Sequence, residues 1–459
     1  MSWRAIGLAF ALGLTAPAAF VQAAPVEYTP AQMRVLGYQL IGSGDGLAAL
    51  QIADGLLERD KTDASAHLLR AQALELLQDR TKSLQAGRLA FKNAKDRDTS
   101  FSAAMFMANS LTSDQRNTAA QLWLRRAAQN APNAASKAYA RGEFDMVRSR
   151  NPLILSFDAS VRPSSNVNNG STATSFRNPG FPWLPPEILI EGEQRALSGV
   201  VSTFSADLTY RLPPTATTRT ELLMHLDQSL VWLSPEAKLD APEARAGNYA
   251  AATVEAGFVR LYRPLDSKLT YRFGAFAGHD WAAGRDLANR LRLELAGDLS
   301  ISDGLSATAS FSAEKQTRLD AAVRSSDIYG TTLALTKRLD KGDILQFSLS
   351  GRETETDSLG LQNTAVAARI VWRKAKPVAG MGISLSAVTE LRDYPFSPYN
   401  PIGGRTDHRN LLAVTLDLNK VEYMGFSPSV NLTASDINSN VSLFSAREFG
   451  INLGFKSNF

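Results

Sequence analysis

The chain of 459 residues contains no cysteine. Disulfides and thiolate metal sites are therefore excluded, and we expect that the protein is not itself a lipoprotein, because lipidation of an N-terminus needs a cysteine. An excess of one charge is also lacking. The formal net charge is +4, and basic and acidic residues are interspersed along the whole chain. This balance gives no sign of nucleic-acid binding, so no nucleic-acid partner is expected.

Long hydrophobic runs are equally scarce. A short apolar segment, Ala5 to Leu14, follows Arg4 and precedes the small-residue cleavage site Val21-Gln22-Ala23. This pattern is typical of a secretory signal, so we expect residues 1–23 to be a signal peptide rather than a membrane anchor. No later stretch of about 18 apolar residues occurs, so no transmembrane helix is expected. An exported chain of this kind can still cross a membrane as a closed barrel.

Residues 24–150 are predicted to form a helical domain, because apolar residues recur there at spacings of three and four. Small residues mark a repeat within it, since Ala49, Ser83 and Ala120 are 34 and then 37 residues apart. A spacing near 34 resembles the second helix of a tetratricopeptide repeat, a surface suited to binding a peptide or protein segment; a generic helical bundle is the alternative. The predicted packing positions of the repeat are Ala49, Leu56, Ser83, Ala90, Ala120, Ala127 and Pro132.

From about residue 151 to residue 459 the apolar period changes to two. Leu305, Ala307, Ala309, Phe311 and Ala313, for example, alternate with polar residues. We predict fourteen such strands, centred near residues 157, 206, 226, 255, 273, 294, 311, 333, 349, 368, 388, 414, 431 and 452. Their connections are expected to alternate between short ones and long ones, the longest running from Ser164 to Ser198. This pattern indicates a fourteen-stranded antiparallel transmembrane β-barrel, and a soluble β-sandwich is the alternative.

The end of the sequence carries a local signal. Phe449, Ile451, Leu453 and Phe455 alternate with polar residues or glycine, and the chain ends on Phe459. A terminal aromatic residue preceded by alternating apolar residues resembles the recognition signal of the barrel-assembly machinery, although Ser457 departs from the pattern. We therefore expect this machinery, together with the lipids of the outer membrane, to be a partner of the chain.

No arrangement typical of an enzyme is found. The four histidines, His67, His225, His279 and His408, lack metal-ligand spacing, and no nucleophile elbow or phosphate-binding loop occurs. His225 and Asp227 share one face of a predicted strand, which we interpret as a structural pair. We expect no enzymatic activity, cofactor or metal. The charges predicted to face the lumen have mixed signs, which favours a salt-bridged interior over a selective ion pore: Asp158, Arg162, Asp207, Arg211, Arg272, Arg292, Glu294, Arg369, Arg373, Glu390 and Asp417.

A family resemblance lies at the junction of the two predicted domains. Asn151-Pro152-Leu153 and Phe157 are followed by Pro163-Ser164-Ser165-Asn166-Val167-Asn168-Asn169. With the whole layout, this sequence resembles the surface lipoprotein assembly modifier family. The resemblance implies an outer-membrane translocator of a Gram-negative cell (type eleven secretion) that exports surface lipoproteins or small secreted proteins. It also implies a helical domain that binds this protein cargo in the periplasm, and it supplies no catalytic residues.

Two other functions stay open at this stage. One is a polysaccharide exporter with a tetratricopeptide scaffold, and the other is a plain porin. Nothing in the sequence is typical of nucleotide binding, so protein transport would use cargo folding or partner chaperones. The loop from Ser164 to Ser198 contains Pro179-Gly180-Phe181-Pro182-Trp183. We expect a loop this rich in apolar residues to fold over or into the barrel and restrict passive flow.

Overall fold

The computed structural model describes residues 28–177, 185 and 187–457. The expected signal peptide, the loop segment 179–183 and Phe459 lie outside these residues. The chain divides into two compact units, Met1–Lys95 and Asp96–Phe459. Among the described residues, the first unit holds four α-helices. The second unit holds three more, the barrel, and a short helix α8 (Pro235–Asp240) in one of the barrel's connections.

Within residues 28–152, seven helices precede the first strand: α1 (Pro30–Ser43), α2 (Gly46–Arg59), α3 (Ala64–Leu76), α4 (Arg80–Asn93), α5 (Arg97–Ser113), α6 (Asn117–Asn130) and α7 (Ala134–Arg150). Aspartate begins four of them, because its side chain accepts a hydrogen bond from a backbone N–H of the first turn: Asp45, Asp63, Asp79 and Asp96. Gly44 ends α1 with a positive φ of 84°. These boundary residues cut the sequence into short helices joined by tight turns.

Consecutive helices pack against each other within each unit. The predicted packing positions lie on the second helix of each pair, α2, α4 and α6, apart from Pro132, which follows α6. Ala49, Ala90 and Ala120 are all 0% exposed. Ser83 is also fully buried, and its hydroxyl donates to the carbonyl of Ala71 on α3 at 3.0 Å. Such small side chains let neighbouring helices approach closely.

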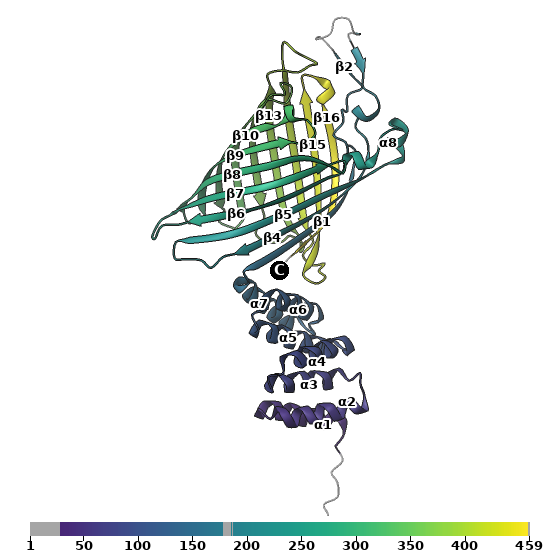
Figure 1. Ribbon diagram of the computed structural model, residues 1–459, viewed down its shortest axis with the longest axis vertical. Coiled ribbons are helices and arrows are strands. Elements are labelled where there is room, and N and C mark those ends of the chain that lie inside the picture. The colour runs from purple at the N-terminus through teal and green to yellow at the C-terminus, as the bar shows by residue number, and fades with distance from the viewer. Residues whose placement is uncertain (1–27, 178–184, 186, 458–459) are drawn as a thin grey trace, which may run out of the picture. The chain divides into compact units, whose positions relative to one another are not determined.

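The second unit contains a closed antiparallel barrel of fourteen strands (Figure 1). They are β1 (Leu153–Ser164), β4 (Gly199–Arg211), β5 (Thr218–Leu233), β6 (Ala251–Tyr262), β7 (Leu269–Ala282), β8 (Arg285–Ser302), β9 (Leu305–Arg318), β10 (Ser326–Arg338), β11 (Ile344–Thr356), β12 (Asn363–Arg373), β13 (Gly382–Tyr394), β14 (Arg405–Asp417), β15 (Phe426–Ser439) and β16 (Ala446–Ser457). Each predicted strand centre lies within one of these strands. The sequence prediction of a helical domain followed by a fourteen-stranded barrel is confirmed.

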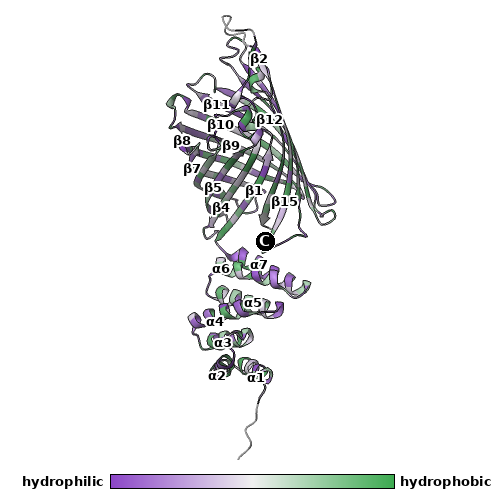
Figure 2. Cartoon of the chain, turned by 90° about the vertical axis from the view of Figure 1, so that its right-hand side faces the viewer, coloured by the Kyte–Doolittle hydropathy of each residue, from purple (hydrophilic) through white to green (hydrophobic). Residues whose placement is uncertain are grey.

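The barrel wall has an apolar outer face and a polar inner face. Figure 2 shows hydrophobic and hydrophilic residues alternating along the strands. On β8, Leu291, Leu293 and Leu295 are 57%, 47% and 55% exposed, and the residues between them are Arg292 and Glu294. Exposed leucine at every second position is the lipid-facing pattern of an outer-membrane barrel.

The expected alternation of short and long connections holds only in part. We call the rim where β1 begins the helix side, and the rim where β1 ends at Ser164 the loop side. The loop side carries the long connections, but also the two-residue turn Ala283–Gly284 between β7 and β8. Both turn residues have positive φ, 54° and 71°, as type I′ hairpin turns require. The helix side in turn carries the longer connections 374–381 and 418–425.

Candidate functional site

An ion network lines the inner wall of strands β6 to β9. Arg290 lies 2.8 Å from Asp280, 3.6 Å from Glu255 and 4.0 Å from Glu314, and Arg292 lies 2.7 Å from Glu255. The side chains of Arg290, Glu255 and Asp280 are only 14–17% exposed. Loss of one partner would leave a poorly solvated charge, so the network holds this part of the wall in one arrangement.

The charges predicted to face the lumen all lie on the inward face of their strands by the alternation of the barrel register. Glu390 pairs with Arg392 at 2.5 Å on β13. The prediction omitted four charges of the central network, which are Glu255, Asp280, Arg290 and Glu314. Glu255 was hidden because it stands among small residues, Ala256 and Gly257, where the alternation of apolar side chains is weak.

The interpretation of His225 and Asp227 as a structural pair is corrected in its partners. His225 Nδ1 lies 2.7 Å from Asp207 on the neighbouring strand β4. Asp227 instead accepts a hydrogen bond from the Ser205 hydroxyl at 2.7 Å. The two residues share a face, but each forms its contact with a residue of the neighbouring strand. Side chains directly opposite each other on paired strands lie closer together than side chains two positions apart on one strand.

The long connection between β1 and β4 is held at the loop side of the barrel. Its strands β2 (Ser175–Arg177) and β3 (Glu187–Leu189) form a separate hairpin. We expected this connection to fold over or into the barrel. Figures 1 and 2 both place β2 beyond the rim rather than inside the barrel. Its base is buried with the next connection, in a cluster made of Val167, Leu197, Val201, Val231, Leu233, Ala237 and Ala241.

Polar contacts add to this cluster at the loop side. The Tyr249 hydroxyl donates to Glu193 at 3.1 Å, and burial together with this carboxylate raises the pKa of Tyr249 to about 12. The Ser171 hydroxyl donates to the carbonyl of Ser442, at 2.9 Å, in the connection between β15 and β16. The connection after the first strand is therefore tied to the last two strands as well.

On the helix side, the connection 418–425 between β14 and β15 contacts helices α6 and α7. We call these contacts the rim clamp. The side chain of Glu422 is 5% exposed, lies 3.1 Å from Lys137 and forms a hydrogen bond with Arg141. The backbone N–H of Met424 donates to the Gln129 side chain at 3.0 Å. The contacts fix α6 and α7 to this rim of the barrel.

Arg125 completes the rim clamp. Its guanidinium lies 5.3 Å from the ring centre of Phe144 on α7 and 4.9 Å from that of Phe426 on β15. It also donates to the carbonyl of Met424 at 3.3 Å. Burial, followed by the nearby charge of Arg148, lowers the pKa of Arg125. The two rings offset part of this loss, because an aromatic face attracts a cation.

The barrel closes between β1 and β16. β1 pairs with β4 from Leu153 to Ser164, but it pairs with β16 at four described positions, between Ala159 and Ser164. Side chains reinforce this closure, because Arg162 and Ser164 both form hydrogen bonds with Glu448, the latter at 2.6 Å. Strand β16 carries the residues predicted as the assembly signal. Phe449, Ile451, Leu453 and Phe455 are 59%, 42%, 55% and 59% exposed.

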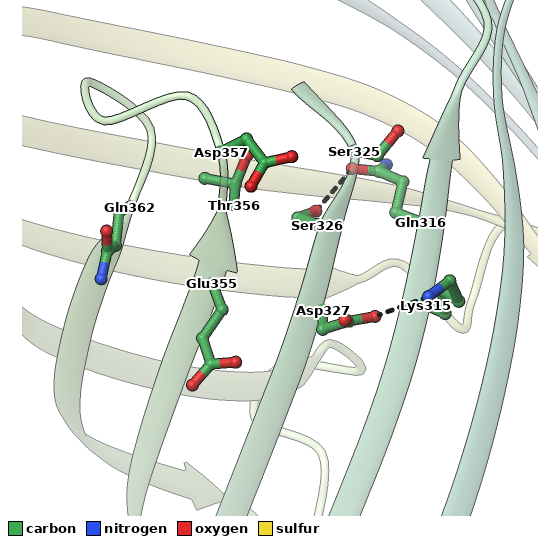
Figure 3. Close-up of a pocket in the computed structure, with 9 residues that line it drawn as sticks. All are labelled: Lys315, Gln316, Ser325, Ser326, Asp327, Glu355, Thr356, Asp357 and Gln362. Carbon is green, nitrogen blue, oxygen red and sulfur yellow. Dashed lines mark hydrogen bonds and ion pairs between the residues drawn. The ribbon is translucent and has the colours of Figure 1, made fainter. Parts of the chain in front are cut away.

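A polar pocket of about 440 Å³ lies at the loop-side ends of β9, β10 and β11 (Figure 3). Lys315 Nζ lies 3.7 Å from Asp327, and the Ser326 hydroxyl donates to Gln316 at 3.3 Å. Lys315 and Asp327 occupy the positions that alternate with the inward residues, so they lie on the outer face.

Among the described residues, no group of three His, Asp or Glu side chains is placed to hold a metal ion. No described helix has both the length and the hydropathy needed to cross a bilayer.

Comparisons with known proteins give weak likenesses. No protein-family model and no curated protein matches the chain. The helical part is similar to the type III secretion translocator chaperone SycD of Yersinia enterocolitica, with 13% identity over 27% of this chain and 88% of that one (TM-score 0.24).

The barrel is similar to OccAB3 of Acinetobacter baumannii, with 8% identity over 66% of this chain and 99% of that one (TM-score 0.34). It is also similar to a bacterial polysaccharide outer membrane secretin, with 8% identity over 66% and 98% of the two chains (TM-score 0.33). Scores this low carry no functional argument, so the assignment depends on the strand register and the exposed apolar face. The protein is an outer-membrane β-barrel preceded by a helical domain.

Proposed function

We propose that the protein is an outer-membrane translocator that exports partner proteins, and that it is a member of the surface lipoprotein assembly modifier family. The rim clamp carries this proposal. Helices that are joined to a barrel rim through the buried Glu422 and through Arg125 have no use in a diffusion porin. They have a use where a substrate must be held next to the barrel before it crosses the membrane.

The helices present apolar side chains that suit a protein cargo. In the first unit, Val35 and Leu47 are 58% and 60% exposed. In the second unit, Leu122 on α6 and Tyr139 on α7 are each 56% exposed. Exposed apolar side chains on a helical repeat are a surface for an extended peptide or an unfolded segment, whereas a polysaccharide offers little apolar area to bury.

The lumen sets the state in which cargo passes. A fourteen-stranded barrel lies between filled eight-stranded barrels and the sixteen-stranded porins with an aqueous channel. The ion network around Arg290 occupies part of that space. A folded domain does not fit, so cargo crosses unfolded or leaves through an opened closure between β1 and β16.

Co-expression with a candidate partner tests this function. A small lipoprotein or secreted protein encoded beside this chain is produced with it or without it, and protease is added to intact cells. We expect the partner to be degraded only when the barrel is present. A partner that stays protected, together with large stable channels in planar bilayers, would contradict export and favour a porin. Surface polysaccharide that depends on the chain would favour the polysaccharide alternative.

The orientation of the barrel is a separate prediction. The helical domain is proposed to lie in the periplasm, so the loop side faces the medium. Ile402 is 100% exposed in the loop-side connection 395–404, and Asp340 is exposed on the helix side. In the cysteine-free chain, Ile402→Cys is expected to react with an impermeant maleimide on intact cells, and Asp340→Cys only after lysis. The reverse labelling pattern would exclude this orientation.

A further inference from the structure

Arg260 occupies an unusual position on the outer face of the barrel. It lies on β6, two residues before the strand ends at Tyr262 on the helix side. Its register partner on β7 is Phe273, which is 39% exposed on the lipid-facing side. Among the described residues, no carboxylate forms an ion pair with Arg260. A guanidinium at the edge of the apolar band needs an anion or water to compensate its charge.

A trough of about 640 Å³ lies beside Arg260 on the same face. Its floor is made by Gly297 and Ala309, which are register partners on β8 and β9. One flank is the stacked pair Tyr262 and Tyr271, with ring centroids 6.2 Å apart. The trough exists because these two small residues stand beside the large outward side chains of Tyr271, Leu295 and Phe311.

Shape alone would not select an occupant. Lipid tails are as apolar as the barrel wall, so burying the trough under an acyl chain gives no hydrophobic driving force in a bilayer. The cation provides the selectivity, because a guanidinium binds phosphate oxygens through charge-assisted hydrogen bonds in a planar fork. Tyrosines beside it are the side chains that are enriched at the level of lipid headgroups.

We propose that Arg260 and the trough bind one glycerophospholipid. The phosphate accepts hydrogen bonds from the Arg260 guanidinium, and one acyl chain lies over Gly297 and Ala309. The site is independent of the proposed export function, because it requires only that the barrel stands in a lipid bilayer.

Native mass spectrometry of the full-length chain tests the site. The delipidated protein in detergent is titrated with phosphatidylglycerol, with diacylglycerol of the same acyl chains, and with inorganic phosphate. We expect one retained phosphatidylglycerol for each chain and no comparable retention of the other two. Arg260→Gln is expected to weaken retention about tenfold, the effect of losing a charge-assisted contact.

Gly297→Leu tests the trough separately. A Cβ at Gly297 would meet only Leu269 Cδ1, at an ordinary 3.6 Å, so the substitution fills the trough without backbone strain. We expect a similar loss of retained lipid. Two matched controls should retain the lipid. Gly351→Leu adds a side chain on the same face, at a position where a Cβ would meet nothing within 4 Å. Arg447→Gln removes a guanidinium that pairs with Asp436 at 2.7 Å near the loop side.

Several results would overturn the site. Equal retention of diacylglycerol would mean that the headgroup is not recognised, and equal binding of inorganic phosphate would mean that the acyl chain is not. Unchanged retention by Arg260→Gln would exclude the guanidinium. Dimers that disappear in Gly297→Leu would assign the trough to a second copy of the chain. Heat-modifiable migration confirms folding of each variant. If Arg260→Gln does not fold, Arg260→Lys is expected to show a smaller loss, and no loss would count against the proposal.

Discussion

A chain with aspartate in place of both Phe455 and Phe459 is expected to be produced without forming an inserted barrel. Phe455 is 59% exposed on the lipid-facing side of β16 and is the register partner of Ala159 across the closure. Aspartate there puts a charge toward lipid, at a cost that depends on depth and stays below about 2–4 kcal/mol, the cost of an Arg or Lys at the bilayer midplane. The same change removes the terminal aromatic residues that we expect the barrel-assembly machinery to recognise. The measurement is the amount of heat-modifiable barrel in the outer membrane.

A matched control separates the lipid-facing charge from a general effect of aspartate. Thr433 lies on the inward face of β15 opposite Gly450, where Arg162 is close by. Thr433→Asp is expected to insert normally, because its charge faces the polar lumen and a cation. Phe455→Leu should also insert. Normal barrel levels in the double aspartate variant would disprove the assembly signal.

Deleting residues 28–95 is expected to leave the barrel in place and to reduce partner export about tenfold or more. The deletion removes the first compact unit and ends before Asp96, which begins α5. The rim clamp on α6 and α7 is preserved. Export falls because a tethered binding site raises the local concentration of cargo at the barrel, and this gain is lost with the site. Protease shaving of the partner, normalised to barrel level, is the measurement.

A second variant distinguishes cargo binding from attachment of the helices. Glu422→Arg places a third cation beside Lys137 and Arg141, so α6 and α7 should lose their contacts with the connection 418–425 while all helices remain. Export is expected to fall here too. Asp145→Arg reverses an exposed charge on α7, the helix that carries Lys137 and Arg141, and should leave export unchanged. Export at the original level after the deletion would show that the first unit has no part in transport.

The strands were predictable from the sequence because alternation is a local property. An apolar residue at every second position, as on β8 from Leu291 to Leu295, identifies a strand and its lipid-facing side. The helices were predictable for a similar reason, since apolar residues recur there at spacings of three and four. In both cases the signal lies within a few residues of the element that it predicts.

Partners were not predictable in the same way. His225 pairs with Asp207, which is 18 residues away, because the β4–β5 ladder places them opposite each other. A register shift of two residues would keep both side chains facing the lumen and would still give each another partner. Contacts such as Arg141 with Glu422, which are 281 residues apart, leave no periodic trace at all. The face of a strand on which a side chain lies follows from the sequence, whereas its partner on the neighbouring strand depends on the register.

The rim clamp has a mechanical consequence. α7 passes directly into β1 through residues 151–152, and Glu422 and Arg125 join α6 and α7 to the hairpin of β14 and β15 as well. β15 is the neighbour of β16, and β16 closes the barrel against β1 at four described positions. A force on these helices therefore reaches β1 and β15, the two neighbours of β16. The ladder between β16 and β1 is the shortest described one in the wall. Under the proposed export function, a load from bound cargo would therefore act on the closure between β1 and β16.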